Sequence, residues 1–257
     1  MSRIIALFVF VFLITFSLKA EEKSVYGLGI SVLSAPAYIG SNKQNLYVVP
    51  FPYIEYRGKY FNIDKDKIYN ELYNTEKTKV EISLRGMLPV DSKDTAREGM
   101  PDLDAIIEIG PKIIYNLFSK GDMKIDLELP IRANFSIGDS LFDYQGYFSS
   151  FDLKYENSIF DNYKISFISG LGYSNKKINN YYYEVESKYV NENRTEYHSS
   201  SGYSDFHNSL SITKKDKSFW YGGFIKHYYI DGAVYKDSPL VETDNALFLG
   251  IASSYLF

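Results

Sequence analysis

The chain has 257 residues, a formal net charge of −4 and no cysteine. This mildly acidic charge argues against a nucleic-acid partner, and the lack of cysteine excludes thiol catalysis and cysteine metal sites. Aromatic residues make up 17% of the chain, with 25 tyrosines and 18 phenylalanines. Rings with one polar tip are typical of barrel proteins at the membrane–water boundary, although a secreted, tyrosine-rich β-sandwich is an alternative on composition alone.

The first predicted element is an export signal over residues 1–20. Arg3 precedes an apolar run from Ile4 to Leu18, which Lys19 and Ala20 end. This run is shorter than the roughly 20 residues that a membrane-spanning helix needs, and a charged start followed by an apolar run is typical of a signal peptide. We expect cleavage after Ala20 and a single domain over residues 21–257.

The clearest predicted strand runs from Met123 to Phe135, where apolar and polar residues alternate. A helical period would spread its charges around the whole circumference, whereas a period of two places them all on one face. One face therefore suits lipid and the other a polar barrel interior. Pro130 lacks a backbone donor, so we expect a bulge or a locally weak point there.

The same pattern predicts an all-β, transmembrane antiparallel β-barrel. Twelve strands are expected, of which the third and fourth are the weakest because Asp64 to Lys67 interrupts them. The expected ranges are 24–33, 45–56, 58–64, 67–74, 77–88, 103–118, 122–136, 144–157, 162–174, 199–214, 218–230 and 244–257.

The connections between the predicted strands alternate in length. The short ones are 57–58, 74–76, 119–121, 157–161 and 215–217, and the long ones include 34–44, 89–102, 175–198 and 231–243. Bacterial outer-membrane barrels have short periplasmic turns and long outer loops. We therefore expect a cell outer-membrane protein with both chain ends in the periplasm. The longest loop, with Tyr181 to Tyr183, is predicted to be either an outer contact surface or a lid.

The alternation also directs charges of both signs into the barrel from three neighbouring strands. A barrel of twelve strands leaves a lumen between those of filled eight-stranded barrels and open porins. The charges therefore form either an ion-paired plug or a charged channel or binding cavity. These candidate binding residues are Glu81, Arg85, Glu108, Lys112, Lys124, Asp126, Glu128 and Arg132.

Few residues suggest catalysis. The chain has three histidines and lacks HExxH, GxSxG and phosphate-loop motifs. His207 and Ser209 share a strand face, and outer-membrane lipid A deacylases carry a similar His-x-Ser pair. Asp205 and His207 likewise share a face, as an omptin-type protease would require. A strand with one histidine and several serines gives the same pattern, so we expect no catalytic residues, no metal and no cofactor.

Several segments together resemble one known family. They are Tyr26–Ile30, Pro36–Ser41, Val49–Tyr56, Pro101–Ala105 with Glu108–Gly110, the run Asp237, Ser238, Pro239, Leu240 and Val241, and a terminal strand carrying Tyr255 and Phe257. These segments are similar to the MipA/OmpV family of MltA-interacting outer-membrane proteins. Residues 63–74 depart from it, because they are charged where the family tends to be glycine-rich.

The resemblance implies a non-enzymatic scaffold or binding protein of the cell envelope. Its implied partners are a murein transglycosylase and a murein synthase, and no catalytic residues come with the family. The other expected partners are outer-membrane lipid and the barrel-assembly machinery, which would engage the strand that ends in Tyr255 and Phe257. The first alternative is a narrow pore or small-molecule-sequestering barrel, and the second is an outer-membrane lipid hydrolase that uses His207 and Ser209.

Overall fold

The structure is a computed structural model that describes residues 24–57, 62–64, 67–138, 141–160 and 162–257. The expected signal peptide and residues 58–61 of the expected third strand lie outside the described residues. Within them the strands are β1 (Ser24–Pro36), β2 (Gln44–Arg57), β3 (Asn62–Asp64), β4 (Lys67–Asn74), β5 (Thr78–Met87), β6 (Ala105–Lys120), β7 (Met123–Ile137), β8 (Leu141–Ile159), β9 (Tyr163–Ser174), β10 (Gly202–Lys215), β11 (Phe219–Tyr229) and β12 (Asn245–Leu256).

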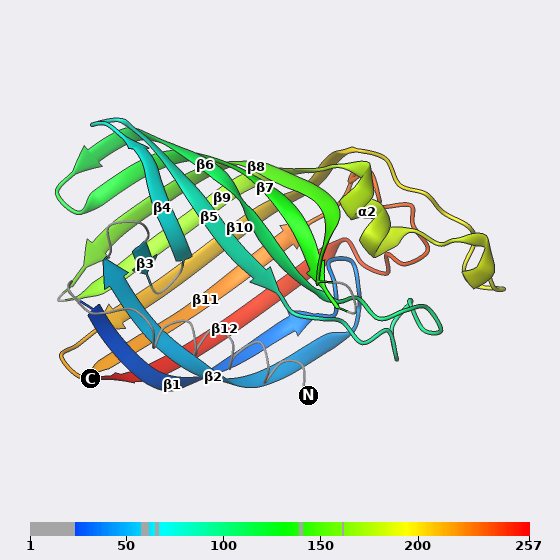
Figure 1. Cartoon of the computed structure of the whole chain (residues 1–257), viewed down its shortest axis with the longest axis horizontal. Helices are drawn as coiled ribbons and strands as arrows, with labels where there is room; N and C mark the ends of the chain where they lie inside the picture. Colours follow the sequence, from blue (N-terminus) through cyan, green and yellow to red (C-terminus); the bar gives the residue numbers. More distant parts are fainter. Residues whose placement is uncertain (1–23, 58–61, 65–66, 139–140, 161) are drawn as a thin grey trace.

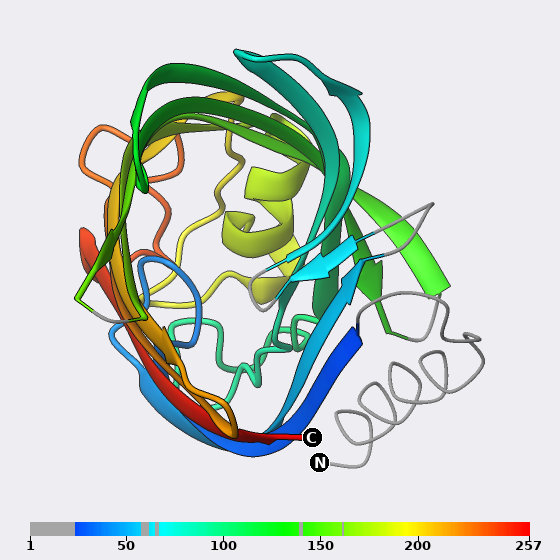
Figure 2. The same ribbon diagram turned by 90° about the vertical axis from the view of Figure 1, so that its left-hand side faces the viewer.

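The strands pair antiparallel in chain order and close into a barrel (Figures 1 and 2). The closure is made by β1 and β12, from Gly27 opposite Leu256 to Ser34 opposite Leu249. The predicted all-β antiparallel fold is confirmed. None of the helices in the part of the chain that the structure describes is both long and apolar enough to cross a membrane.

Alternation along β7 gives the barrel its two surfaces. Leu129 and Ile131 are 37% and 43% exposed on the outside, whereas Glu128 and Arg132 are 7% exposed on the inside. Burying polar groups toward a lumen and leaving apolar ones outside is the reverse of a water-soluble protein, and it suits a barrel in lipid. Pairing on both sides of β7 is interrupted next to Pro130, at the predicted weak point.

Aromatic rings gather near both ends of the strands. Phe219 lies 5.3 Å from Tyr255, between ring centroids, where β11 begins and β12 ends. Toward the opposite end Tyr147 and Tyr173 stack at 6.1 Å. Two such girdles, one at each membrane–water boundary, are typical of transmembrane β-barrels.

The two ends of the barrel differ in their connections. Short turns link the strands at the end where β1 starts and β12 stops, and long segments lie at the other end (Figure 1). The long segments include α2 (Lys176–Tyr183) and the 3-10 helix η1 (Ser187–Tyr189). This arrangement has the alternation of short and long connections that the sequence predicts.

Candidate functional site: a charged lumen beneath a tyrosine lid

The interior carries an ion-pair network across β5, β6 and β7. Glu81 is fully buried, and its carboxylate lies 3.1 Å from the Lys112 ammonium and 3.2 Å from that of Lys79. Lys112 also contacts Glu128 at 3.2 Å. Because Glu81 and Lys112 are opposite each other on β5 and β6, the inward alternation of two adjacent strands is enough to bring them together.

A second part of the network centres on Glu108. Its carboxylate lies 3.8 Å from Arg85 and 3.9 Å from Arg132, and the Arg132 Nε donates to the Ser83 hydroxyl at 2.9 Å. Six of the eight sequence-predicted charges line the internal cavity, while Glu81 and Glu108 lie behind its wall. The six are Arg85, Lys112, Lys124, Asp126, Glu128 and Arg132.

A histidine held by two carboxylates lies across β8, β9 and β10. His207 Nδ1 is 2.7 Å from Asp205, and its Nε2 is 3.1 Å from Asp152. Gly170 of β9 is opposite both Asp152 and His207, and a Cβ there would lie 2.2 Å from the Asp152 carboxylate. The missing side chain therefore lets His207 reach across an intervening strand.

This geometry bears on the two catalytic interpretations of the sequence. Both ring nitrogens of His207 contact carboxylates, so neither is directed at Ser209. Ser209 lines the same internal cavity as His207, away from the lipid-facing surface. The Asp205–His207 contact of an omptin-type site is present, but Asp152 holds the nitrogen that such a site would direct at water. In this geometry His207 offers no free nitrogen to act as a base toward Ser209 or a water molecule.

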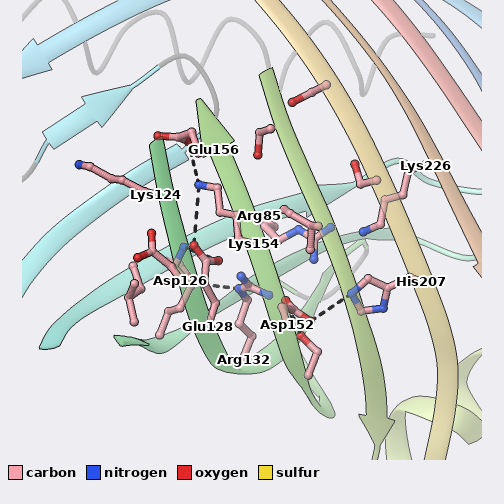
Figure 3. A pocket seen from close by; sticks show the side chains of 18 of the residues that line it. Arg85, Lys124, Asp126, Glu128, Arg132, Asp152, Lys154, Glu156, His207 and Lys226 are labelled. Atoms are coloured by element: carbon pink, nitrogen blue, oxygen red, sulfur yellow. Dashed lines mark hydrogen bonds and ion pairs between the residues drawn. The ribbon is translucent and has the colours of Figure 1, made fainter. Parts of the chain in front are cut away.

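The cavity has a volume of about 600 Å³ and a wall rich in basic side chains (Figure 3). Lys79, Lys124 and Lys164 are each the second residue of a strand that begins at the short-turn end, so the wall reaches close to that rim. At its other end the wall includes His207 and Tyr228. Eight basic and four acidic side chains line it; the basic ones are Lys79, Arg85, Lys112, Lys124, Arg132, Lys154, Lys164 and Lys226, and the acidic ones are Asp126, Glu128, Asp152 and Glu156.

The other end of the barrel is covered by a lid, which we define as residues 175–201. Asn175 caps α2, since its side chain accepts a hydrogen bond from the Ile178 N–H at 3.3 Å. The same oxygen accepts from Tyr147 of β8 at 2.9 Å, which fixes the start of the helix to the barrel wall. Gly146 has a φ of +117°, and a Cβ there would lie 2.3 Å from that oxygen, so a glycine makes the close approach possible. Viewed end-on, α2 lies within the ring of strands (Figure 2).

Tyr183 fastens the lid to a buried aromatic cluster. Its ring stacks on Tyr235 with 3.9 Å between centroids and meets Tyr38 edge-on at 6.3 Å. Its hydroxyl donates to the Ile39 carbonyl at 2.9 Å. Buried, hydrogen-bonded tyrosines of this kind contribute both apolar area and directional bonds. The sequence left open a contact surface or a lid for this loop, and the structure shows a lid.

The segments that carry the family resemblance meet at this lid. Ser238 donates to the Tyr183 carbonyl at 2.7 Å, and the Tyr38 hydroxyl donates to the Leu240 carbonyl at 2.8 Å. The Tyr181 hydroxyl donates to the Asp104 carbonyl at 3.3 Å. We call residues 237–241 the clasp, because Ser238 and Leu240 are buried against the lid and its cluster. The sequence identified the clasp as a signature but carried no signal of what it fastens.

Two buried arginines join the lid to the loop that precedes β6. Arg97 donates to the Tyr182 carbonyl at 2.7 Å, and Arg194 donates to the carbonyls of Ala96 and Glu98 at 2.9 and 3.0 Å. Burial lowers the pKa of Arg97, and burial also raises the pKa of Tyr181 to about 12. On the exposed side of the lid, a hydrogen bond to Glu184 raises the pKa of His198.

Comparison with known proteins finds one matching family and several solved structures of low sequence identity. The family described as "MltA-interacting protein MipA" matches residues 28–257. No curated protein sequence matches the chain. Similar solved structures include a bacterial polysaccharide outer membrane secretin, with 7% identity and a TM-score of 0.47 over 93% of this chain and 100% of that one. An outer membrane channel from Pseudomonas putida F1 has 9% identity and a TM-score of 0.44 over 93% and 97% of the two chains.

The family match, the closed barrel and its apolar exterior agree on location. A closed barrel satisfies its backbone hydrogen bonds between neighbouring strands, as the hydrocarbon region requires, and its apolar outside faces lipid. The prediction of an outer-membrane protein is confirmed. The family match covers nearly the whole described chain. This chain is therefore a member of the MipA family of MltA-interacting proteins.

Proposed function

We propose that this protein is a non-enzymatic scaffold of the outer membrane, closed at its outer mouth, that binds murein enzymes at its periplasmic end. The observation that carries the proposal is the lid: Tyr183, Tyr38 and the clasp fill the mouth at the long-loop end. The family description names MltA as an interaction partner, and the resemblance adds a murein synthase. A barrel closed on the outside leaves the periplasmic end as the accessible surface for such partners.

We assign the short-turn end to the periplasm, as in other bacterial barrels. Its turns offer little surface, yet one of them carries an exposed aromatic ring. Phe160, between β8 and β9, is 87% exposed. Exposed aromatic residues rimmed by polar groups are frequent anchors of protein interfaces. The polar neighbours Asn162, Asp216 and Lys217 lie on this turn and the next along the rim.

Binding of a purified murein transglycosylase to the refolded protein in nanodiscs tests this proposal. We expect saturable binding, measured by biolayer interferometry, and a loss of about tenfold or more in affinity on Phe160→Ser because interface anchors are worth 2 kcal/mol or more. Phe142→Ser is the matched control, since Phe142 is also exposed, at 59%, and also has a positive φ, but lies at the opposite end of β8. Absence of binding by the folded wild type, or an equal loss in both variants, would overturn the scaffold proposal.

We further propose that the mature chain follows removal of residues 1–20 and forms a barrel of twelve strands. The terminal strand would be the one handed to the barrel-assembly machinery. In support, Tyr255 of β12 and Phe257, which follows β12, are exposed, and the Phe257 N–H donates to the Tyr26 carbonyl of β1 at 2.9 Å. Because β12 pairs with β1 to close the barrel, that pairing has to form last.

The second candidate function is sequestration of a small molecule in the lumen, and the cavity of about 600 Å³ is the observation that favours it. A conducting pore is less favoured, because the lid covers one mouth. A lipid hydrolase is the least favoured alternative, since both nitrogens of His207 are held by carboxylates.

A further inference from the structure

Basic side chains converge on one hydroxyl deep in the lumen cavity. Tyr228 of β11 has the Lys226 ammonium 4.4 Å from its ring centroid and His207 at 5.7 Å between ring centroids. Arg85 reaches into the same cavity from β5. Figure 3 shows Arg85, Lys226 and His207 directed into the same part of the cavity. Arg85 of β5 and Lys226 and Tyr228 of β11 therefore line one part of the cavity, while both ring nitrogens of His207 are held by carboxylates.

These charges are less fully compensated than that of Lys112. Lys112 contacts two carboxylates, at 3.1 and 3.2 Å. By contrast, the nearest acid of Arg85 is Glu108 at 3.8 Å, and the Arg85 side chain is 45% exposed to the cavity. Among the described residues, Lys226 has a ring contact and no carboxylate within 4.0 Å. Its neighbours on the adjacent strands, Ser209 and Phe248, are uncharged, and the nearby carboxylates of Asp152 and Asp205 are engaged by His207.

We propose that Arg85, Lys226 and Tyr228 form a binding site for a small oxyanion, a carboxylate or a phosphate, that enters from the periplasmic end. Guanidinium groups match the two oxygens of such anions, and an ammonium group adds charge-assisted hydrogen bonds. The Ser209 hydroxyl, on the strand next to Lys226, provides a further donor. A cavity of about 600 Å³ has room for an organic anion of drug size or smaller.

The route to the site follows from the two ends of the cavity. The lid lies over its outer end, where Tyr235 of the aromatic cluster donates to the Ser204 carbonyl of β10 at 2.8 Å. At the other end Lys79, Lys124 and Lys164 line the cavity near the rim, at the starts of β5, β7 and β9, and basic side chains at an entrance raise the local concentration of anions. This proposal deepens the second candidate function and rests on the periplasmic assignment of the short turns, but it does not depend on binding to a transglycosylase.

Isothermal titration of the refolded mature protein in detergent micelles tests the site. The probes are inorganic phosphate and citrate, which separate the phosphate from the carboxylate class, and spermidine is the cationic control. We expect one anion to bind with a Kd below about 1 mM. Lys226→Met is expected to weaken binding about tenfold through loss of a charge-assisted contact. Lys120→Met, which removes the same charge from the exposed end of β6, is expected to leave the Kd unchanged.

Protection of Arg194 from trypsin shows that each variant is folded, so a loss of binding in a protected variant is assigned to the site. The proposal is overturned if neither anion binds to folded protein at about 10 mM, or if both lysine variants lose affinity equally. Anion binding with no capture of a transglycosylase would support this site and contradict the scaffold. Binding of a transglycosylase without anion binding would support the scaffold and contradict this site.

Discussion

Lys112→Met is expected to lower the free energy of unfolding by about 3 kcal/mol, because it leaves two buried carboxylates without their shared cation. Glu81 is fully buried and Glu128 is 7% exposed, so water offers little compensation to either. Lys79 and Lys154 remain, at 3.2 Å from Glu81 and 3.8 Å from Glu128, and their presence places the effect toward the lower end of the usual range. The measurement is urea unfolding of the refolded protein in phospholipid vesicles, followed by the fluorescence of its single tryptophan.

Two further variants separate loss of charge from loss of packing. Lys112→Arg retains the charge and is expected to cost less than Lys112→Met. The double variant Glu81→Leu with Lys112→Met removes a pair rather than one partner, and we expect it to recover part of the stability. If Lys112→Met and Lys120→Met unfold at the same urea concentration, the network does not stabilise the barrel and its role as a plug is wrong.

Tyr183→Ala is expected to detach the lid. The substitution removes the stacking on Tyr235, the edge contact with Tyr38 and the hydrogen bond to Ile39, at a cost of about 3–5 kcal/mol typical of a large buried aromatic residue. Opening of the lid can be followed at Arg194. In the closed state this residue is 7% exposed and donates a hydrogen bond to the loop before β6. Trypsin cleavage after Arg194 should accelerate by about 100-fold, since cleavage of an opened state follows its equilibrium population.

A reference site for trypsin cleavage and a control substitution both lie within the lid. Lys188 has an exposed side chain, 61% accessible, so cleavage after it should be similar in the wild type and the variant. Tyr189→Ala removes a half-exposed ring from the same loop and is expected to leave Arg194 protected. Equal protection of Arg194 in the wild type and in Tyr183→Ala would mean that the aromatic cluster does not hold the lid.

The barrel itself could be predicted from the sequence because its signal is local. An alternation such as that of Met123–Phe135 fixes which side chains face inward without reference to any other strand. The inward direction of the predicted charges follows from it, whereas the pairing of Glu81 with Lys112 also requires the register of β5 against β6, which the alternation does not predict. Of the predicted third strand, the described residues include Asn62–Asp64.

The features that sequence reasoning missed depend on contacts between distant segments. His207 reaches Asp152 only because Gly170, which lies between them in the sheet, has no side chain. The spacing of these residues along the chain does not predict that they lie side by side. The function of the clasp was hidden for the same reason: Ser238 meets Tyr183 across 55 residues. A run of three tyrosines is equally compatible with an exposed contact surface and with a buried cluster. The two could be distinguished only once the closed barrel showed where the loop lies.

We infer that the lid, together with the ion pairs of the lumen wall, closes this barrel to ions. Single-channel recording of the refolded mature protein in a planar bilayer tests it most directly, with insertion verified by protection of Arg194 from trypsin. We expect no steady conductance steps from the wild type, because the lid covers the outer mouth and the charged groups of the network are paired with one another along the wall formed by β5, β6 and β7. Steady steps with cation or anion selectivity from protein whose Arg194 is protected would contradict this account and assign the lumen charges to a transport path.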